Sequence, residues 1–366
     1  MANDLTMVAM SGGVDSSLSA FLLHREGRPL AGLFMKNWEE EDEAAGCPAE
    51  QDAADAQAVA ERLGIPFYAR NFAAEYWDRV FTRFIAEYRR GWTPNPDILC
   101  NREIKFDVFL AHAADLGAGR IATGHYCRKI TEDGVHFLLK GRDSDKDQSY
   151  FLSALSQAQL AHAEFPLGEW TKRQVRAEAR AAGIPVHAKR DSTGICFIGE
   201  RRLGEFLARY IADTPGPIVD PGGRQLGRHQ GLHRFTLGQR QGIGIGGVRD
   251  APEAPWYVIA KDPARNTIVV AQDPEHPALL ADRLEAAELN WIARPPAPGA
   301  SLWAKIRYRQ IDQPCTVVTL DPAGDRLVLS FTRPQRAVTP GQSVVLYDGD
   351  LCLGGGVIQC SNAPAP

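Results

Sequence analysis

A glycine-containing loop between an apolar run and a helical pattern constrains the fold of this chain more than any other feature. The run Thr6 to Met10 has the length of a short buried strand, and Ser11 to Asp15 forms the loop. From Ser16 to about Arg25 the apolar residues recur at helical spacing. A glycine loop at a helix N-terminus presents backbone N–H groups to an anion. The segment therefore predicts an anion-binding site at the end of a strand.

The rest of the first half alternates strands with helices. One predicted helix ends near Leu63, after an acidic and polar stretch. This alternation predicts a parallel sheet covered on both faces, with ligands at the carboxyl ends of the strands. The loops after Met10, Met35 and Thr123 are therefore expected to line one site. The further strands are predicted at Leu30 to Met35, Pro66 to Arg70 and Gly119 to Thr123, and a long helix at Ala74 to Arg90.

The second half, after about Arg209, has a different pattern. Short β-rich runs are separated by turns rich in Pro and Gly, which is typical of small sandwiches or barrels. We therefore predict an α/β protein: a doubly wound parallel-sheet domain followed by two small β-rich modules, the last a β-barrel. The predicted divisions are residues 1–209, 210–285 and 286–366, with the Pro- and Ala-rich stretch Trp291 to Gly299 as a linker between two modules.

The charge of the chain is near neutral overall but clustered locally. The formal net charge of -4 argues weakly against a nucleic-acid partner. However, five arginines and no acidic residue lie between Pro221 and Arg249, and further basic groups gather at residues 172–180 and 305–309. Such patches suit a polyanion bound at one face. A solvated arginine-rich surface is the alternative.

Two features bear on the compartment. The first residues are polar, and no apolar stretch approaches the roughly 18 residues of a membrane span, so a cytoplasmic protein without a membrane partner is expected. The seven cysteines form no CxxC pairs, which argues against a zinc site or a disulfide framework.

A proline-stiffened segment ending at Asn101 places a cysteine before a predicted helix. Its two prolines disfavour helical geometry in the residues before them, and Asn101 is a suitable cap for a helix beginning near Arg102. Cys100 would then sit beside a helix N-terminus, where the dipole stabilises a thiolate. Asp97 is close enough in sequence to accept a proton. A structural turn with a buried cysteine is the alternative.

A second cysteine, Cys196, lies in the glycine-containing segment Asp191 to Gly199. Positive neighbours lower the pKa of a thiol and make it nucleophilic. A buried cysteine in a strand is the alternative. The basic residues nearby are Lys189, Arg190, Arg201 and Arg202.

The glycine loop near the N-terminus is of a particular kind. It lacks the lysine of the GxxxxGK[ST] loop of kinases and GTPases. It resembles instead the PP-loop of the ATP pyrophosphatases, which split ATP between the α and β phosphates and adenylate a substrate. Ser11, Ser16 and Ser17 can add hydroxyl donors, and Asp15 can hold Mg²⁺ through phosphate oxygens. The glycines at 242–247 lack the helix of a dinucleotide site, which is therefore rejected.

Motifs spread nearly end to end resemble the tRNA-specific 2-thiouridylase family, and their ordered set is highly specific. The resemblance implies ATP-dependent 2-thiolation of the wobble uridine of tRNA, by adenylation of the 2-carbonyl oxygen and sulfur transfer from a cysteine persulfide. It implies ATP and Mg²⁺ as cofactors, the tRNA anticodon arm and a sulfur-relay donor protein as partners, and a monomer. The motifs are SGGVDSS, TPNPDILCNREIKF, ATGHYCR, KDQSYFL, DSTGICFIGERR, HRFTLGQRQGIG, KIRYRQ and TPGQSVV.

The same resemblance implies roles for individual residues. Cys196 would carry the persulfide, Cys100 would be the second catalytic thiol that forms a disulfide with it, and Asp97 would be the general acid/base. Asn95 and Pro96 would meet the target uridine together with Asp97. The ATP phosphate loop would comprise Ala9, Met10, Ser11, Gly12, Gly13, Val14, Asp15 and Ser16, with Met35 and Gly124 on the adenine side. The tRNA contacts would include Lys146, Asp147, Gln148, Arg307 and Tyr308, with His125 and Gln342 near the same surface. The two basic β-rich modules would hold the anticodon arm through its phosphates.

Two other classes of protein share part of this pattern. An ATP pyrophosphatase that forms a nitrogen bond in a small molecule would use the same phosphate loop, but it leaves Cys100, Cys196 and the basic modules unexplained. A non-catalytic RNA-binding protein would explain the arginine clusters but leaves Asp15 and the serine-rich loop without a role.

Overall fold

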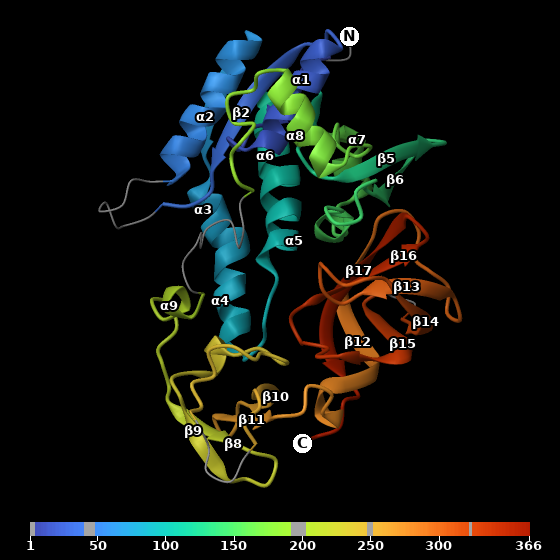
Figure 1. Cartoon of the computed structure of the whole chain (residues 1–366). Helices are drawn as coiled ribbons and strands as arrows, with labels where there is room; N and C mark the ends of the chain where they lie inside the picture. Colours follow the sequence, from blue (N-terminus) through green and yellow to red (C-terminus); the bar gives the residue numbers. More distant parts are fainter. Residues whose placement is uncertain (1–3, 40–47, 192–202, 247–251, 322–323) are drawn as a thin grey trace.

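The computed structural model describes residues 4–39, 48–191, 203–246, 252–321 and 324–366. The chain forms three parts that follow one another along the sequence (Figure 1). They are an α/β domain, a small β-rich module and a C-terminal barrel, so the predicted fold class is confirmed.

The first part is built on a five-stranded sheet in the order β3-β2-β1-β4-β7. All of its pairings are parallel. From β1 the chain moves outward on one side to β2 and β3, and later returns on the other side to β4 and β7. The strands are β1 (Thr6–Ala9), β2 (Leu30–Lys36), β3 (Phe67–Asn71), β4 (Arg120–Ala122) and β7 (Ala163–Glu164).

Helices cover both faces of this sheet, because alternate strand residues point to opposite sides. Val8 and Met10 pack toward α1, α2 and α8, whereas Met7 and Ala9 pack toward the helices from α3 to α6. The first group is α1 (Val14–Arg25), α2 (Pro48–Leu63) and α8 (Lys172–Ala181). The second group is α3 (Ala73–Tyr76), η1 (Trp77–Phe81), α4 (Thr82–Arg89), α5 (Pro96–Cys100), η2 (Asn101–Val108) and α6 (Phe109–Asp115).

The strand order reverses between β1 and β4, and this switch point is where ligands bind in open α/β sheets. The loop after β1 and the segment after β4 approach closely there. A Cβ on Gly124 would lie 2.9 Å from the Ser16 nitrogen and 3.0 Å from the Asp15 carbonyl carbon. A glycine at 124 therefore lets the two loops meet.

A hairpin that was not predicted leaves the first part and joins the barrel. Its strands are β5 (Cys127–Glu132) and β6 (Val135–Lys140), followed by η3 (Ser149–Leu152) and α7 (Gln157–His162). β6 pairs with β17 of the barrel through Leu139 with Leu351 and Leu138 with Cys352. Buried residues of both parts, including Tyr150 and Tyr347, belong to one apolar cluster. The first part and the barrel are therefore packed together.

The central module has a four-stranded sheet in the order β10-β11-β8-β9. Its core is small and centres on Ile218, Phe235, Val258 and Ile268. The elements are α9 (Leu203–Leu207), β8 (Gly216–Val219), β9 (Gln225–His229), η4 (Leu232–Arg234), β10 (Tyr257–Asp262) and β11 (Thr267–Ala271).

The C-terminal barrel closes because its first strand also pairs with its last. The elements are η5 (Pro277–Leu279), β12 (Leu280–Trp291), β13 (Ser301–Lys305), β14 (Gln313–Leu320), β15 (Arg326–Arg336), β16 (Ser343–Asp348) and β17 (Leu351–Ser361). The stretch 291–299 joins β12 to β13 of this barrel, so its interpretation as a linker between modules is wrong. The predicted division at 285/286 falls inside β12, and we propose that the barrel begins at Leu280.

No helix in the described residues is long and apolar enough to cross a bilayer.

Candidate active site

The loop predicted to bind phosphate, which we call the phosphate loop, joins β1 to α1 and is held by its own serine side chains. Ser16 Oγ accepts a hydrogen bond from the Ser11 N–H (3.1 Å) and donates one to the Gly13 carbonyl (3.1 Å), to which Ser17 Oγ also donates (2.8 Å). Gly13 is the N-cap of α1, and its carbonyl accepts the Ser17 N–H as well. The N–H groups of the first helical turn precede the helical ladder and are therefore available to an anion.

Glycine is required at position 12 of this loop. Gly12 has φ +71°, and a Cβ there would lie 2.2 Å from the carbonyl oxygen of Asp52. Both the left-handed backbone and the close approach to α2 exclude a larger residue.

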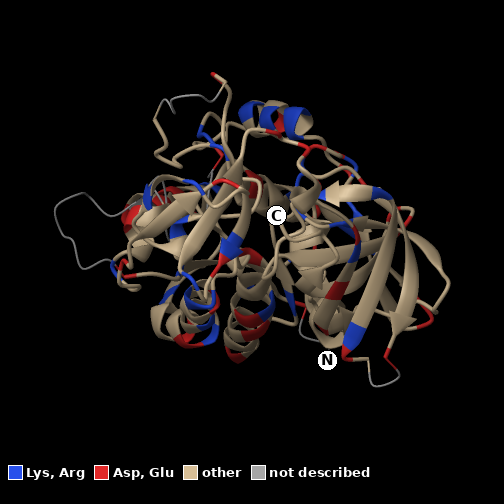
Figure 2. Cartoon of the chain, turned by 90° about the horizontal axis from the view of Figure 1, so that it is seen from below, with Lys and Arg blue, Asp and Glu red and all other residues tan. Residues whose placement is uncertain are grey.

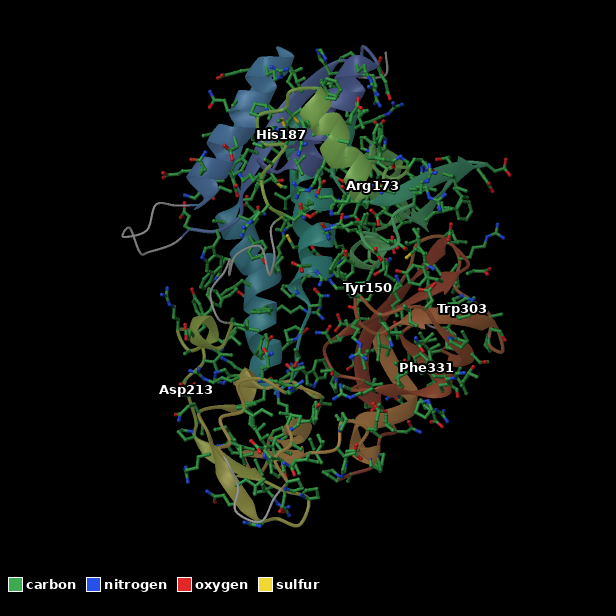
Figure 3. The ribbon with its side chains drawn as sticks, in the orientation of Figure 1. Tyr150, Arg173, His187, Asp213, Trp303 and Phe331 are labelled. Carbon is green, nitrogen blue, oxygen red and sulfur yellow. The ribbon has the colours of Figure 1, made fainter. Side chains whose placement is uncertain are left out.

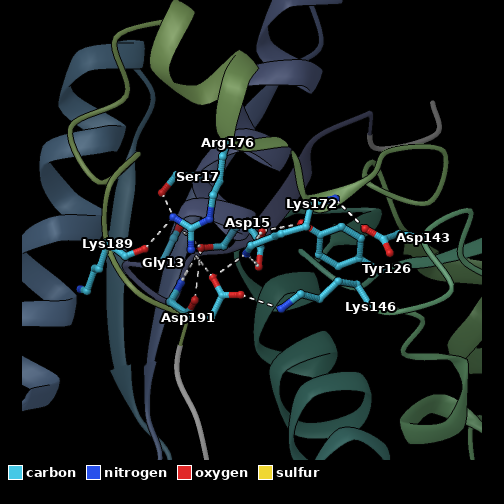
Figure 4. A network of polar contacts seen from close by, with 12 residues as sticks. Gly13, Asp15, Ser17, Tyr126, Asp143, Lys146, Lys172, Arg176, Lys189 and Asp191 are labelled. Atoms are coloured by element: carbon cyan, nitrogen blue, oxygen red, sulfur yellow. Dashed lines mark hydrogen bonds and ion pairs between the residues drawn. The ribbon is translucent and has the colours of Figure 1, made fainter. Parts of the chain in front are cut away.

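Asp15, in the first turn of α1, is held by two partners from distant elements. Lys172 Nζ lies 2.8 Å from each carboxylate oxygen, and the Tyr126 hydroxyl donates to Oδ1 at 2.7 Å (Figure 4). Burial and the negative charge of Asp15 raise the pKa of Tyr126, which therefore remains a protonated donor.

A second carboxylate, Asp191, stands beside this pair. It forms ion pairs with Lys172 (2.7 Å), Lys146 (2.8 Å) and Arg176 (2.6 Å) (Figure 4). Burial raises the pKa of Asp191, but the hydrogen bonds and charges of Lys146 and Lys172 outweigh it and hold the pKa at about 2. Two anions and three cations are thus assembled next to the phosphate loop.

The donor set at Asp15 fits a magnesium ion bound together with phosphates. Mg²⁺ prefers oxygen ligands and is commonly held by one or two carboxylates and the phosphates of a substrate. Asp15 supplies a carboxylate at the anion-binding end of α1. Over the ranges that the structure describes, no group of three His, Cys, Asp or Glu side chains is arranged to hold a metal ion by itself.

The proline-stiffened segment differs from its prediction in where the helix begins. α5 starts at Pro96, and its N-cap is Asn95, whose Oδ1 accepts the Asp97 N–H at 3.1 Å. The helical backbone continues through Asn101 into η2, so Asn101 is not the N-cap of a following helix. The expectation that Cys100 lies beside a helix N-terminus is therefore wrong. The physical reason is that proline is well tolerated in the first helical turn, where its missing N–H costs nothing.

Of the two cysteines predicted to be catalytic, the structure describes only Cys100. Cys100 is buried at 2% exposure among the helices from α3 to α6. Cys196, the predicted persulfide carrier, lies outside the described residues. Burial raises the pKa of Cys315 and of Cys352 to about 12, which makes both poor nucleophiles.

Asp97 and His125 are both influenced by the positive charge of Lys105. Burial raises the pKa of Asp97, and Lys105 opposes this effect. Burial and Lys105 together lower the pKa of His125 well below its usual value. His125 is 9% exposed, with Nδ1 2.8 Å from Thr123 Oγ1. Asp97 can therefore hold a proton at a higher pH than an ordinary aspartate, whereas His125 is neutral and interior.

All three parts of the protein meet at Thr93. Its N–H donates to Pro340 of the barrel (3.1 Å), and its carbonyl accepts Gln342 Nε2 (2.6 Å). Its hydroxyl lies 3.1 Å from that of Thr236 in the central module. The loop that carries Asn95 is thus positioned by the two β-rich parts.

A pocket opens beside this junction. Asn95 and Pro96 line it from the loop, Arg83 and Glu87 from α4, and the barrel closes it with residues that include Ser343. The predicted uridine contacts Asn95 and Pro96 therefore lie at a concave surface between the first part and the barrel.

Three of the predicted tRNA contacts are held by groups within the protein, and one of them, Asp147, faces the barrel. Asp147 is 4% exposed, accepts the N–H groups of Gly141 and Ser149 (3.1 Å each), and lies 3.5 Å from Lys305 Nζ of the barrel. Gln148 Oε1 accepts the Tyr126 N–H at 3.0 Å. His125, also buried, packs against Phe106 and Phe165.

The remaining predicted tRNA contacts are more accessible. Lys146, with a side chain 40% exposed, reaches toward the phosphate loop through Asp191. Tyr308 packs on Phe151 with ring centroids 4.3 Å apart, and Arg307 Nη2 donates to the Arg336 carbonyl at 3.0 Å. Tyr150 lies at the boundary between the first part and the barrel (Figure 3).

The basic clusters are partly neutralised in the folded chain. Figure 2 shows Lys and Arg interspersed with Asp and Glu. Arg234 of the central module pairs with Asp213 at 2.7 Å, whereas Arg173 of α8 is exposed. Arg249 lies outside the described residues.

The sequence analysis assigned no site role to Lys172, Tyr126 or Asp191. Tyr126 directly follows Gly124 and His125, and Asp191 opens the segment of Cys196. Both residues are therefore next to segments that were predicted to belong to the site. Lys172 appeared only as one member of a basic cluster, because nothing in its local sequence links it to a loop 157 residues away.

Three family models match successive stretches of the chain. The tRNA methyl transferase HUP domain matches residues 4–200, the tRNA methyl transferase PRC-barrel domain residues 204–272, and the aminomethyltransferase beta-barrel domain residues 281–358.

Curated relatives match over almost the whole length. The tRNA-specific 2-thiouridylase MnmA of Methylococcus capsulatus is 58% identical, covering 96% of this chain and 95% of its own. The enzyme of the same name from Chromohalobacter salexigens is 56% identical over 96% of this chain and 92% of its own. That from Escherichia coli O1:K1 is 56% identical over 96% of both chains.

Proposed function

Because the chain belongs to the tRNA-specific 2-thiouridylase family, whose members are tRNA sulfurtransferases, we propose that it replaces the 2-oxygen of the wobble uridine of tRNA with sulfur at the expense of ATP. The observation that carries this proposal is the identity of 56–58% over 96% of the chain with relatives of that name. The anion-binding loop at the switch point and the Asn95 pocket beside the barrel support it.

The first step is activation of the uridine. Its 2-oxygen is a poor leaving group, so it attacks the α-phosphorus of ATP, an O–P bond forms, and the bond to pyrophosphate breaks. Asp97 takes the N3 proton of the uridine as this happens, which its raised pKa favours. The N–H groups at the N-terminus of α1 hold the phosphates. Asp15 would hold Mg²⁺ with the phosphates, where the ion supplies charge neutralisation.

The second step is sulfur transfer. The terminal sulfur of a Cys196 persulfide attacks C2 and displaces AMP, which leaves the base joined to Cys196 through two sulfurs. The Cys100 thiolate then attacks the Cys196 sulfur, so the S–S bond breaks and the two cysteines are left as a disulfide. Asp97 returns the proton to N3, and 2-thiouridine is released. An external dithiol reduces this disulfide, and a protein sulfur donor restores the persulfide. The role of Cys196 rests on the family resemblance.

The β-rich parts would present the tRNA. Gln342 and Thr236 contact the loop that carries Asn95, so binding of the anticodon arm to these parts would place the uridine near Asp97. An anticodon base costs little to unstack, because it lies in a single-stranded loop. We further propose that one chain acts alone, in the cytoplasm.

The test is direct assay of the product. Purified protein is incubated with unmodified tRNA, ATP, Mg²⁺ and a low-molecular-weight persulfide as the sulfur donor, and the digested RNA is examined for 2-thiouridine by mass spectrometry. We expect an ATP-dependent exchange of one oxygen for sulfur at the wobble position. Cleavage of ATP to AMP without thiolated RNA would move the substrate elsewhere.

A matched pair of variants tests the role of Cys196. Cys196→Ser should abolish thiolation but leave ATP-dependent adenylation of tRNA, whereas Cys360→Ser, at an exposed cysteine of the barrel, should behave as wild type. Full thiolation by Cys196→Ser would overturn the persulfide assignment.

A further inference from the structure

The phosphate loop has hydrogen-bond donors but no cation of its own. Residues 11–17 contain no Lys or Arg, and the first turn of α1 contains the acidic Asp15. Pyrophosphate leaving from ATP carries several negative charges, and backbone N–H groups alone neutralise them poorly. A side chain that assists Mg²⁺ in neutralising the pyrophosphate must therefore reach this loop from another element.

We propose that Lys172 is a catalytic residue that binds the β- and γ-phosphates of ATP and neutralises the departing pyrophosphate, and that the Asp191 carboxylate holds the place of a phosphate until ATP binds. This inference rests on the proposed ATP-dependent function. It assigns to Lys172 the phosphate-binding cation that residues 11–17 do not supply.

The position of Lys172 is fixed independently of its charged partners. It is the first residue of α8, whose N-cap Thr171 forms a capping box with Gln174. The Lys172 N–H donates to Asp143 Oδ2 at 2.7 Å. The side chain, 12% exposed, therefore starts from an anchored backbone and reaches Asp15 across the mouth of the loop.

The contacts of Asp191 show which kind of anionic group this cluster of cations binds. Lys146, Lys172 and Arg176 all reach one carboxylate, at 2.6–2.8 Å. Charge-assisted contacts of this kind are those that phosphate oxygens receive in nucleotide sites. Three cations exceed the needs of a single carboxylate. A polyphosphate that took the place of Asp191 at the N-terminus of α1 would engage all three of them.

A purely structural role for Lys172 is less well supported. The contact between α1 and α8 is already made by the Arg25–Glu178 ion pair (2.8 Å) and by apolar packing that includes Leu18 and Val175. Lys172 is thus not needed to hold the helices together.

The experiment measures nucleotide binding without tRNA, by titration calorimetry in a buffer containing Mg²⁺. The probes are AMP and the non-cleavable analogue α,β-methylene-ATP. For Lys172→Met we expect binding of the analogue to weaken by about 30-fold and binding of AMP to change by less than about threefold, because AMP lacks the phosphates that Lys172 contacts. Equal weakening for both ligands, or none for either, would overturn the proposal.

Two further variants sharpen the result. Arg173→Met removes the neighbouring positive charge of α8, which is exposed (Figure 3), and should bind both ligands as wild type does. Asp191→Asn removes the carboxylate that competes with phosphate, so we expect it to bind the analogue about three- to tenfold more tightly. Weaker binding would show that Asp191 does not stand in for a phosphate.

The test remains informative if Lys172→Met folds poorly, because Asp191→Asn keeps every cation and makes an independent prediction. Its outcome is also separate from that of the proposed function. Failure of the wild-type protein to bind the analogue at all would contradict ATP use itself, whereas binding that is insensitive to Lys172 would contradict only this inference.

Discussion

The two ends of the candidate site are positioned by different means. The phosphate loop is held by hydrogen bonds between residues three to five positions apart, among them Ser11, Gly13 and Ser16. The loop of Thr93 is held by Gln342, which lies 249 positions away in the barrel. The hydrogen bonds that shape the phosphate loop are therefore local to one strand, loop and helix, whereas the uridine end exists only when the three parts are assembled. This difference predicts that the two ends can be damaged separately.

The largest effect is expected from Gly12→Ala. The new Cβ would lie 2.2 Å from the Asp52 carbonyl in a backbone with φ +71°, so the loop must deform. We expect a loss of about 3 kcal/mol or more in the free energy of unfolding, measured by denaturant titration, and loss of binding of α,β-methylene-ATP.

Gly27→Ala is the matched control. Gly27 also has positive φ (+74°), but nothing lies within 4 Å of the added Cβ. It should cost about 1 kcal/mol and leave nucleotide binding intact. Comparable defects in both variants would show that backbone strain alone, and not the contact with α2, makes the phosphate loop sensitive.

Asp147→Asn should have the next largest effect, and it acts at the assembled end. The variant removes the negative charge 3.5 Å from Lys305, in a joint where both side chains are at most 10% exposed. We expect about 2 kcal/mol of lost stability, because the buried Lys305 keeps only its weaker partner Asp312 at 3.7 Å. Affinity for α,β-methylene-ATP should be unchanged in calorimetry. A loss of that affinity would contradict the independence of the two ends.

Gln342→Leu should have a smaller effect on stability and a selective effect on activity. It removes the hydrogen bond that joins the barrel to the Thr93 carbonyl. We expect about 1 kcal/mol of lost stability and roughly tenfold lower kcat/KM for tRNA thiolation, with nucleotide binding intact. Gln359→Leu is the control, because the amide of Gln359 donates within its own strand, to Val357.

The smallest effect concerns Asp97 and pH. Burial raises the pKa of this carboxyl above its unfolded value, so its charged form destabilises the native state above the folded pKa. Asp97→Asn should therefore increase stability at neutral pH, and the gain should shrink as the pH falls through the folded pKa toward about 4, the unfolded value. Denaturant titrations at several pH values measure this difference. A gain that does not change with pH would contradict a raised pKa.

The local end of the site is also the end that the sequence predicted well. The strand from Thr6, the serine-rich loop and the helix ending at Arg25 were all expected, and the structure confirms them. The alternation that predicted a parallel sheet was equally reliable, because the side chains that bury a strand or one face of a helix recur at fixed short spacings. The prediction of the helix cap in the proline-stiffened segment failed, because Asn95 and not Asn101 is the N-cap. Asparagine is a good cap at either position, and spacing alone does not choose between the two.

The sequence by itself determined the alternation of strands and helices around β1, β2 and β3, the glycine loop after β1 and, through its motifs, the family. Tertiary structure alone decided that β12 begins the barrel at Leu280, that β6 pairs with β17, and that Lys172 and Asp191 meet at the mouth of the phosphate loop. The reason is physical. Caps, turns and periodic burial depend on neighbours within a few residues, whereas barrel closure and ion pairs between distant elements depend on how whole domains pack, for which local spacing carries no signal.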